Sequence, residues 1–299
     1  MNGEFGFLIN PLKGEFLGIS ITPLPDHTNR LEAIQKDSNR DGFYYPPQIA
    51  TYNVDLKTNK RKNKVARSER PASLFFLPSS HQITIQNPIC KDGEKGTDEA
   101  LIVFLLAYIH GTRLMPSQWK FDGRVPIKSV NNIYITGSTT LHFLEHVYTW
   151  WKALSENQRI KFVNILYVFN RARSLEWEWD AFLHQYIVFD ALYDLHHEFN
   201  PPSQRPKLKE RFNILCEKYS VFNEDLVNRI YSTRNDLFHE AMWVGSTIGF
   251  GSPDKEAYQL PYHLARLNAQ LICGITGYKN QYTRLPWWVM GTLEFDKMS

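Results

Sequence analysis

The sequence predicts an α+β protein, with a β-rich first part followed by an all-α second part. In the first 90 residues, short runs of alternating apolar residues are separated by Pro, Gly, Asn and Asp, which is typical of strands and turns. From Leu141 onward Pro and Gly become sparse, and apolar residues recur with the period of a helix. We therefore expect a β-rich accessory or sensing domain over residues 1–140 and an all-α domain over residues 141–299.

The first part contains four expected strands and one expected helix. The strands are the short apolar runs at residues 5–10, 15–22, 48–56 and 82–86. The helix is expected over residues 100–110, because Thr97 is a favoured N-cap residue and the acidic Asp98 and Glu99 suit a first helical turn. Gly111 is placed to end this helix, since glycine readily adopts the left-handed backbone of a C-terminal cap.

The second part contains the principal expected helices. They cover residues 160–173, 176–199, 207–220, 223–243 and 262–277. Ser155 and Gln158 form a capping box before the first of them. The second is apolar on nearly every face, so we expect it in the middle of a helical bundle. Asp190, Asp194 and Glu198 interrupt it at four-residue spacing, which puts three carboxylates in one row.

The composition is that of a folded globular protein, with 43% hydrophobic and 22% charged residues. The longest apolar run, residues 100–109, is about half the length that a membrane-spanning helix needs. We therefore expect a cytoplasmic protein without membrane contact. Cys90, Cys216 and Cys273 have no metal-binding spacing and are interpreted as buried, reduced thiols.

The small net charge of +3 is concentrated in the first part of the chain. Residues 1–140 carry 17 Lys and Arg against 13 Asp and Glu, whereas residues 141–299 carry 17 against 18. A basic run contributes much of this excess and supplies the candidate RNA-binding residues Lys60, Arg61, Lys62, Lys64 and Arg67. Such runs are usually solvated loops, and the alternative is electrostatic contact with RNA phosphates.

The candidate site is the hexapeptide Arg-Asn-Asp-Leu-Phe-His at residues 234–239, in the fourth expected helix of the second part. At helical spacing, Arg234 falls in the middle of an apolar arc, while Asn235 and His239 stack at its edge. An arginine keeps its charge, so among apolar neighbours it needs an anion. The internal candidates are Asp190 and Asp194, of which we expect at least one to contact Arg234, and the external candidate is a phosphate.

These residue types suit RNA cleavage without a metal. Histidine titrates near neutrality, so His239 is the candidate for moving the proton of the 2′-hydroxyl or of the leaving 5′-oxygen. The rigid fork of Arg234 matches phosphate oxygens and is the candidate for stabilising the phosphorane. Asn235 is the candidate for positioning the phosphate or the imidazole by hydrogen bonding.

The Arg-Asn-x-x-x-His pattern of Arg234, Asn235 and His239 resembles the signature of HEPN domains, and its surroundings look like the Apea-type branch. This resemblance covers roughly residues 141–299. It implies a helical bundle that forms a homodimer, with two motifs in one cleft, and a cofactor-free endoribonuclease of a toxin, phage-defence or CRISPR-associated system. A regulatory or defence-system partner is implied as well. The products would be a 2′,3′-cyclic phosphate and a 5′-hydroxyl.

Three alternatives remain open. A catalytically silent HEPN module would bind RNA or a partner protein without cleaving anything. A purely structural motif would pair Arg234 with Asp194 and leave His239 as a surface histidine. A zinc peptidase is indicated by the His-x-x-Glu-His pattern of His142, Glu145 and His146, but that chemistry needs a third protein ligand that the sequence does not identify.

Overall fold

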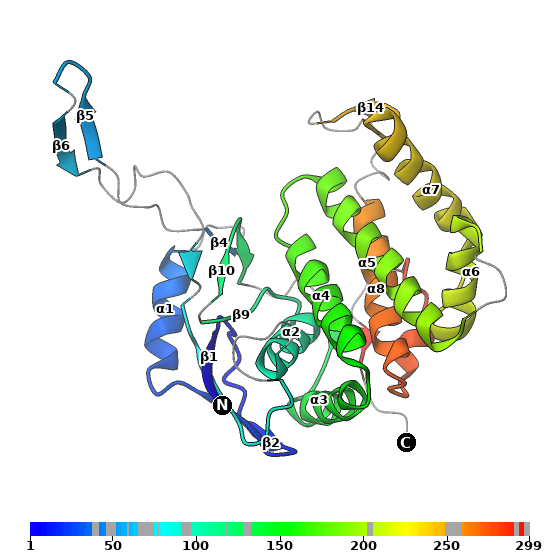
Figure 1. The fold of residues 1–299 in the computed structure, drawn as a ribbon, viewed down its shortest axis with the longest axis horizontal. Coiled ribbons are helices and arrows are strands. Elements are labelled where there is room, and N and C mark those ends of the chain that lie inside the picture. The colour runs from blue at the N-terminus through cyan, green and yellow to red at the C-terminus, as the bar shows by residue number, and fades with distance from the viewer. Residues whose placement is uncertain are drawn as a thin grey trace.

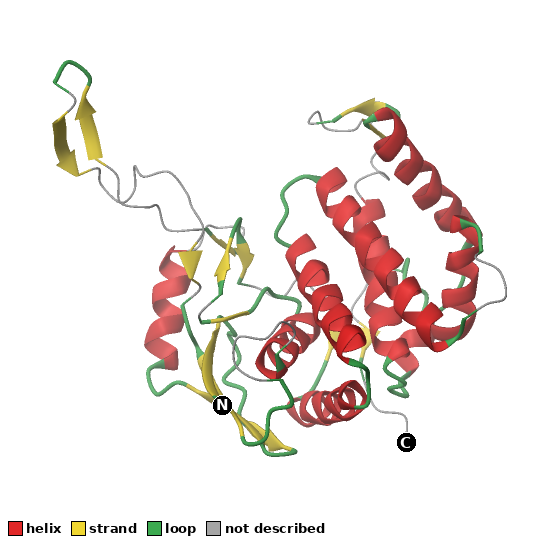
Figure 2. Cartoon of the chain, in the orientation of Figure 1, coloured by secondary structure: helices red, strands yellow, loops and turns green. Residues whose placement is uncertain are grey.

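The computed structural model describes residues 1–37, 42–45, 52–58, 60–64, 75–76, 78–90, 97–117, 119–127, 133–201, 206–248, 259–289 and 293–295. In these residues the chain combines eight α-helices with a five-stranded antiparallel sheet and several two-stranded pairs. Figure 1 shows the sheet and α1 on one side and the longer helices on the other, and Figure 2 shows the same division by type of structure. The expected mixture of helices and strands is therefore present.

The main sheet has the strand order β2-β3-β8-β1-β9. Its strands are β1 (Asn2–Gly6), β2 (Gly14–Phe16), β3 (Ile19–Pro23), β8 (His81–Ile85) and β9 (Met115–Pro116). The strand expected over residues 15–22 is divided in two by a tight turn, in which Leu17 and Gly18 both have positive φ angles of 46° and 76°. The strand expected over residues 5–10 is wrong in position, because β1 ends at Gly6.

Smaller pairs complete the strand content of the described residues. They are β4 (Phe43–Tyr44) with β11 (Val125–Pro126), β5 (Tyr52–Asp55) with β6 (Lys60–Lys64), β7 (Phe75–Phe76) with β10 (Lys120–Phe121), β12 (Ile133–Tyr134) with β15 (Leu293–Glu294), and β13 (Met242–Trp243) with β14 (Ser246–Thr247). The helix α1 (His27–Asp37) was not expected from the sequence. Ile34 is its deeply buried apolar residue, at 2% exposure, so the helix has too few apolar positions to show a clear period.

The helix expected over residues 100–110 is confirmed as α2 (Asp98–His110). The side chain of Thr97 accepts a hydrogen bond from the backbone of Ala100, and Gly111 ends the helix in the left-handed conformation with φ of 61°. All residues of α2 from Asp98 to Ile109 are buried, so the helix has no solvent-facing side.

The described residues of the second part contain six α-helices. They are α3 (Gly137–Lys152), α4 (Glu156–Ala172), α5 (Glu178–Phe199), α6 (Leu208–Tyr219), α7 (Glu224–Asn235) and α8 (Leu260–Ile275). A short 3-10 helix follows at Gln281–Arg284. The expected capping box of Ser155 and Gln158 is confirmed at the start of α4. In Figure 1, α5 runs among α4, α8 and α6, as expected, although Ile187 on its outer side is 45% exposed.

Hydrogen bonds join the two parts of the chain through α2. The Tyr108 hydroxyl donates to the carbonyl of Ala269 at 2.7 Å, and the Asn170 side-chain amide donates to the carbonyl of Phe104 at 2.9 Å. One hydrophobic cluster includes residues of both parts. The division at residue 140 stays a prediction, and the described core extends across it.

Two further expectations concern the cysteines and the membrane. Cys90, Cys216 and Cys273 are buried and form no disulfide bond, as expected. Among the described residues, no helix combines the length and the apolar character that crossing a bilayer requires.

Buried histidines predict a loss of stability in acid. Burial lowers the pKa of His81 to about 3 and that of His110 to about 4, from an ordinary value of 6.5. Between these values and pH 6.5 the unfolded chain binds protons that the folded chain does not. The stabilising contribution of the neutral rings is therefore complete above pH 6.5 and decreases as the pH falls, by about 1.4 kcal/mol per pH unit for each histidine.

We expect His110→Gln to reduce this pH dependence, because it removes a ring whose pKa is lowered by burial. Urea unfolding measured between pH 6.5 and pH 5 should show a slope smaller by about 1.4 kcal/mol per pH unit than in the unmodified chain. Between pH 7 and pH 8 the two proteins should have the same slope. Equal slopes in the acidic range would contradict a buried neutral His110.

Candidate active site

The motif lies where α7 changes its helical geometry. Asn223 caps the start of α7, with its side chain accepting a hydrogen bond from the backbone of Leu226 at 3.1 Å. Val227 and Ile230 are completely buried and fix one face of the helix against the core. After Asn235 the chain continues as one π-helical turn, Asp236–Glu240. The motif therefore spans an α-to-π junction.

The helix expected over residues 223–243 is wrong at its end. The π turn is closed by a hydrogen bond from the backbone of Ala241 to the carbonyl of Asp236, and Ala241 itself has a positive φ of 51°. Trp243 then lies in a short strand, 2% exposed, with its ring 5.4 Å from that of Phe182. Burial of this indole against α5 requires the chain to leave the helix axis, which the apolar pattern alone does not reveal.

The π turn brings Arg234 and His239 together. In an α-helix, residues five positions apart point in different directions, whereas the i to i+5 hydrogen bonding of a π turn brings them toward the same side. Arg234 Nη1 donates to Asn235 Oδ1 at 3.1 Å and lies 3.3 Å from His239 Nε2. Because arginine has no acceptor atom, His239 Nε2 is the acceptor in this hydrogen bond.

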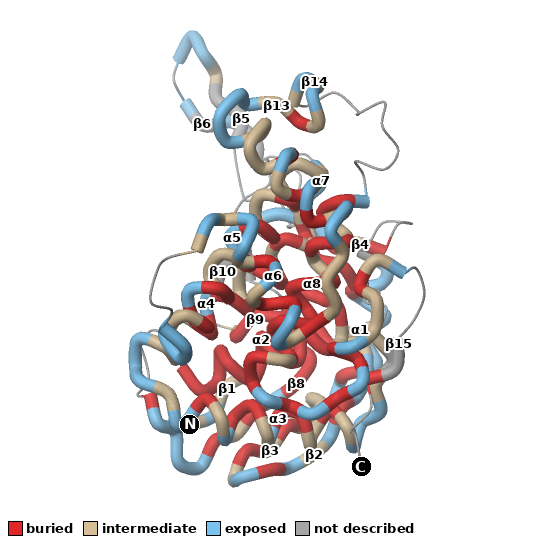
Figure 3. Tube along the Cα trace, turned by 90° about the vertical axis from the view of Figure 1, so that its right-hand side faces the viewer, coloured by how far each residue is buried: buried red, intermediate tan, exposed pale blue. Residues whose placement is uncertain are grey.

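Two aromatic rings flank the Arg234 guanidinium. Its central carbon lies 4.5 Å from the centre of the Phe238 ring and 5.8 Å from that of Tyr186 on α5. Phe238 is 48% exposed and His239 is exposed, while Arg234 and Asn235 are half-buried. Residues 234–241 are all intermediate or exposed, and in Figure 3 the end of α7 lies above the buried centre. The motif is thus accessible to a ligand.

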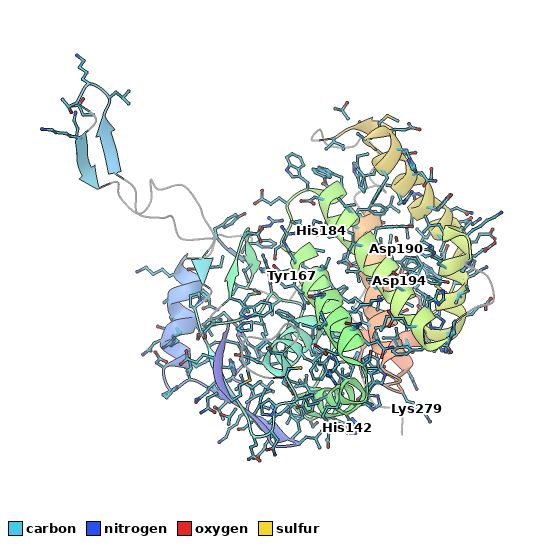
Figure 4. The ribbon with its side chains drawn as sticks, viewed as in Figure 1. His142, Tyr167, His184, Asp190, Asp194 and Lys279 are labelled. Atoms are coloured by element: carbon cyan, nitrogen blue, oxygen red, sulfur yellow. The ribbon has the colours of Figure 1, made fainter. Side chains whose placement is uncertain are left out.

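The expected contact of Arg234 with a carboxylate of α5 is wrong. Asp190 Oδ1 instead accepts a hydrogen bond from Arg211 Nη1 of α6 at 3.1 Å. Asp194 is exposed and makes no ion pair or hydrogen bond with Arg234. Figure 4 shows both carboxylates on the side of α5 that faces α6 and α7, and Arg211 of α6 is the arginine that binds Asp190.

Arg234 affects Asp190 only at longer range. Burial holds the pKa of Asp190 above its usual range, and the positive charges of Arg211 and, less strongly, Arg234 act in the opposite direction. The Arg234 Nε atom is buried and has no hydrogen-bond partner among the described residues, and Nη2 makes no hydrogen bond to any of them. Arg234 therefore retains hydrogen-bond donors that an external anion can bind.

The predicted RNA-binding residues do not lie beside the motif. Lys60 to Lys64 form β6, and Lys62 pairs with Asp55 at 3.1 Å. In Figure 1 this hairpin stands apart from the body of the molecule, on the opposite side from α7 and β14. Arg67 lies outside the described residues. The structure thus brings Arg234, Asn235 and His239 together and leaves the basic hairpin at a distance.

The zinc alternative gains no support from the described part of the chain. His142, Glu145 and His146 lie on α3 as expected. His146 Nε2, however, contacts the carbonyl of Thr276 at 2.9 Å, and the ring of His142 packs 5.9 Å from that of Tyr278. No cluster of three or more metal-ligating side chains is found among the described residues.

Sequence analysis missed three side chains that shape the site. Phe238 lies inside the hexapeptide and was treated as a spacer, although its ring covers the guanidinium of Arg234. Tyr186 lies one turn before Asp190 on α5, which is a readable signal once α5 is known to face α7. Arg211 on α6 has no motif around it, so its pairing with Asp190 becomes visible only in three dimensions.

Comparison with known proteins identifies no relative of this chain: no family model, no curated protein and no solved structure matches it.

The turn that follows the motif predicts a stability effect. Val244 and Gly245 connect β13 to β14 with positive φ angles of 50° and 68°, as a two-residue hairpin loop of type I′ requires. We expect Gly245→Ala to lower the free energy of unfolding by about 1 kcal/mol, because a Cβ atom disfavours this conformation.

Gly137→Ala is the matched control for this measurement. A Cβ atom meets no neighbour within 4 Å at Gly137 or at Gly245, and Gly137 opens α3 without a positive φ. Urea unfolding should leave the Gly137→Ala protein as stable as the unmodified chain or slightly more stable. Equal stability of the two variants would show that the hairpin does not constrain Gly245.

Proposed function

We propose that this chain is a metal-independent endoribonuclease of the HEPN type, with Arg234, Asn235 and His239 as its catalytic residues. The proposal combines the resemblance of the motif with one observation, the Arg234 guanidinium that contacts Asn235 and His239 but pairs with no carboxylate of the described residues. Such an arginine needs an anion, and a phosphate of RNA supplies one. The second part of the chain would then be the all-α HEPN bundle, and the β-rich part an accessory or sensing domain.

The contacts of Arg234 suggest how substrate binding prepares the histidine. In the free protein, Arg234 Nη1 occupies the lone pair of His239 Nε2. A phosphate bound to Arg234 competes for that donor and leaves Nε2 available to accept a proton. The histidine base would therefore become available when the scissile phosphate is in place.

The reaction then follows from the residue types. His239 accepts the proton of the 2′-hydroxyl as the 2′-oxygen bonds to phosphorus, and Arg234 stabilises the charge on the phosphorane oxygens. The bond between phosphorus and the 5′-oxygen breaks, and the leaving oxygen takes a proton from the imidazolium form of His239 in a second copy, in the homodimer that the resemblance implies. The products are a 2′,3′-cyclic phosphate and a 5′-hydroxyl. Asn235 holds Arg234 through the hydrogen bond at 3.1 Å.

The physiological setting that we propose follows from the resemblance alone. The chain would act in the cytoplasm as a toxin or as an antiviral effector of a phage-defence or CRISPR-associated system, under a regulatory partner. The competing proposal is a silent HEPN module, in which the same contacts of Arg234 hold the π turn and RNA or a partner protein binds without being cleaved.

Removing the side chain of His239 or of Arg234 should strongly slow RNA cleavage while the fold is retained. We expect His239→Ala to lower the rate of RNA cleavage by about 10²–10⁴-fold, and Arg234→Ala by about 10²–10³-fold. Cleavage of a labelled single-stranded RNA in excess EDTA, with analysis of the product ends, measures both effects.

His197→Ala is the matched control, because this half-buried histidine of α5 lies outside the motif. It should cleave at the rate of the unmodified chain. If His239→Ala cleaves as fast as the unmodified protein, the mechanism is wrong. If the unmodified protein binds RNA and cleaves none of a broad set of RNAs, the silent module is the correct function.

The basic hairpin predicts a salt dependence of RNA binding. Replacing Lys60, Arg61, Lys62 and Lys64 by glutamine should flatten the dependence of log K on log salt by about 0.7 for each RNA phosphate that the hairpin no longer neutralises. Binding of a single-stranded RNA measured from 50 to 200 mM salt gives this slope. The control removes the same charge from four exposed lysines elsewhere, namely Lys13, Lys36, Lys209 and Lys279. Equal slopes for the two variants would exclude the hairpin as a phosphate-binding element.

A further inference from the structure

A cavity of about 290 Å³ lies between the ends of α4, α5 and α8, apart from the motif. Its space arises because the helices present alanine side chains to one another there, Ala172 from α4, Ala181 from α5, and Ala265 and Ala269 from α8. This volume is close to the lower end of the range of small-molecule sites, and a mostly apolar lining with a few polar groups is typical of them. The cavity is large enough for one small ring compound.

Tyr282 provides a polar group that the fold does not use. It lines the cavity, and its side chain is 3% exposed. Its hydroxyl makes no hydrogen bond to any described residue, although the hydroxyl of a buried tyrosine normally has a partner. Burial raises the pKa of Tyr282, so the hydroxyl stays protonated and acts as a donor. It is suited to an acceptor oxygen of a ligand.

Positive charge gathers around this hydroxyl. Arg266 and Arg173 both line the cavity and lie within electrostatic reach of Tyr282. Arg266 is 8% exposed and donates through Nη1 to the carbonyl of Val289, so its positive charge is held at the buried wall of the cavity. The helix α8 begins at the cavity without a side-chain cap or an acidic residue in its first turn, which adds to the positive potential.

The acidic groups of the cavity are less buried than Arg266. Glu176 is exposed and Glu178 half-exposed, at the start of α5. Their charges are screened by solvent, whereas Arg266 is almost fully buried. The buried end of the cavity therefore favours an anion. Trp177 is 48% exposed beside the glutamates and offers an aromatic face to a ring compound.

We propose that this cavity binds a small aromatic carboxylate, with the carboxylate against the Tyr282 hydroxyl and Arg266 and the ring between the alanines and Trp177. A carboxylate is planar and takes two parallel hydrogen bonds from donors of this kind. The small alanine side chains leave room for an aromatic ring in a cavity of about 290 Å³. Binding at this site does not depend on RNA cleavage, so the proposal stands or falls separately from the proposed function.

The probes are phenylacetate, its neutral analogue phenylacetamide, and phenethylamine, which carries the opposite charge. Isothermal titration of the full chain should give saturable, sub-millimolar binding of phenylacetate, with phenylacetamide bound at least about tenfold more weakly because a charge-assisted hydrogen bond is lost. Phenethylamine should bind no better than phenylacetamide. Tighter binding of phenethylamine, equal binding of phenylacetate and phenylacetamide, or no phenylacetate binding would each overturn the proposal.

Two variants locate the binding. Tyr282→Phe removes only the hydroxyl and should weaken phenylacetate binding by about tenfold. Ala265→Leu, at a half-buried position of α8, should abolish binding by filling the cavity. Ala191→Leu makes the same change at a half-buried position of α5 outside the cavity and should bind like the unmodified chain. If Tyr282→Phe does not fold, the Ala265→Leu and Ala191→Leu pair decides, and equal phenylacetate affinity in that pair would overturn the proposal.

Discussion

The burial of α2 on every side is the constraint on which the rest of the described structure depends. A helix without a solvent face must be covered completely, and the sheet covers one side of it while α3 and α4 cover others. Polar groups at both ends of α2 also have hydrogen-bond partners. Asp98 accepts hydrogen bonds from the backbones of Ile89 and Cys90 and from the Tyr148 hydroxyl, and Arg173 donates to the last carbonyls, including that of Ala107. These bonds fix α4, which in turn holds α5.

The position of α5 then determines the candidate site. Phe182 receives the indole of Trp243, and Tyr186 one turn later lies against Arg234 and Phe238. The segment from Arg234, which lies against Tyr186, to Trp243, which packs on Phe182, includes the π turn. A regular α-helix would direct His239 away from Arg234, so the contact between these two side chains depends on packing against a helix from elsewhere in the chain. The site is a product of tertiary structure as much as of its own hexapeptide.

Features set by neighbouring residues could be predicted from the sequence, whereas features set by tertiary packing could not. Helix α2 was predictable because Thr97 and Gly111 are local signals that act within a few residues. The break at Leu17 was not, because a positive φ at leucine is imposed by its surroundings. Sequence spacing placed Asn235 and His239 on one face of a regular helix, whereas in the structure Arg234 contacts both of them beside a π turn that the spacing does not reveal. The sequence could not show whether Arg234 or Arg211 is the partner of Asp190, because the answer depends on which helix packs closer to α5.

The burial of α2 also has a consequence during synthesis of the chain on the ribosome. The Tyr108 hydroxyl binds a carbonyl 161 residues further along the chain, so its partner in α8 is made much later. At synthesis rates of about 5–20 residues per second, roughly 8 to 30 seconds pass between the synthesis of α2 and that of the part of α8 that packs on it. During this interval the apolar surface of α2 in the nascent chain is incompletely covered and prone to aggregation. Chaperones that bind apolar segments would protect it until translation is complete.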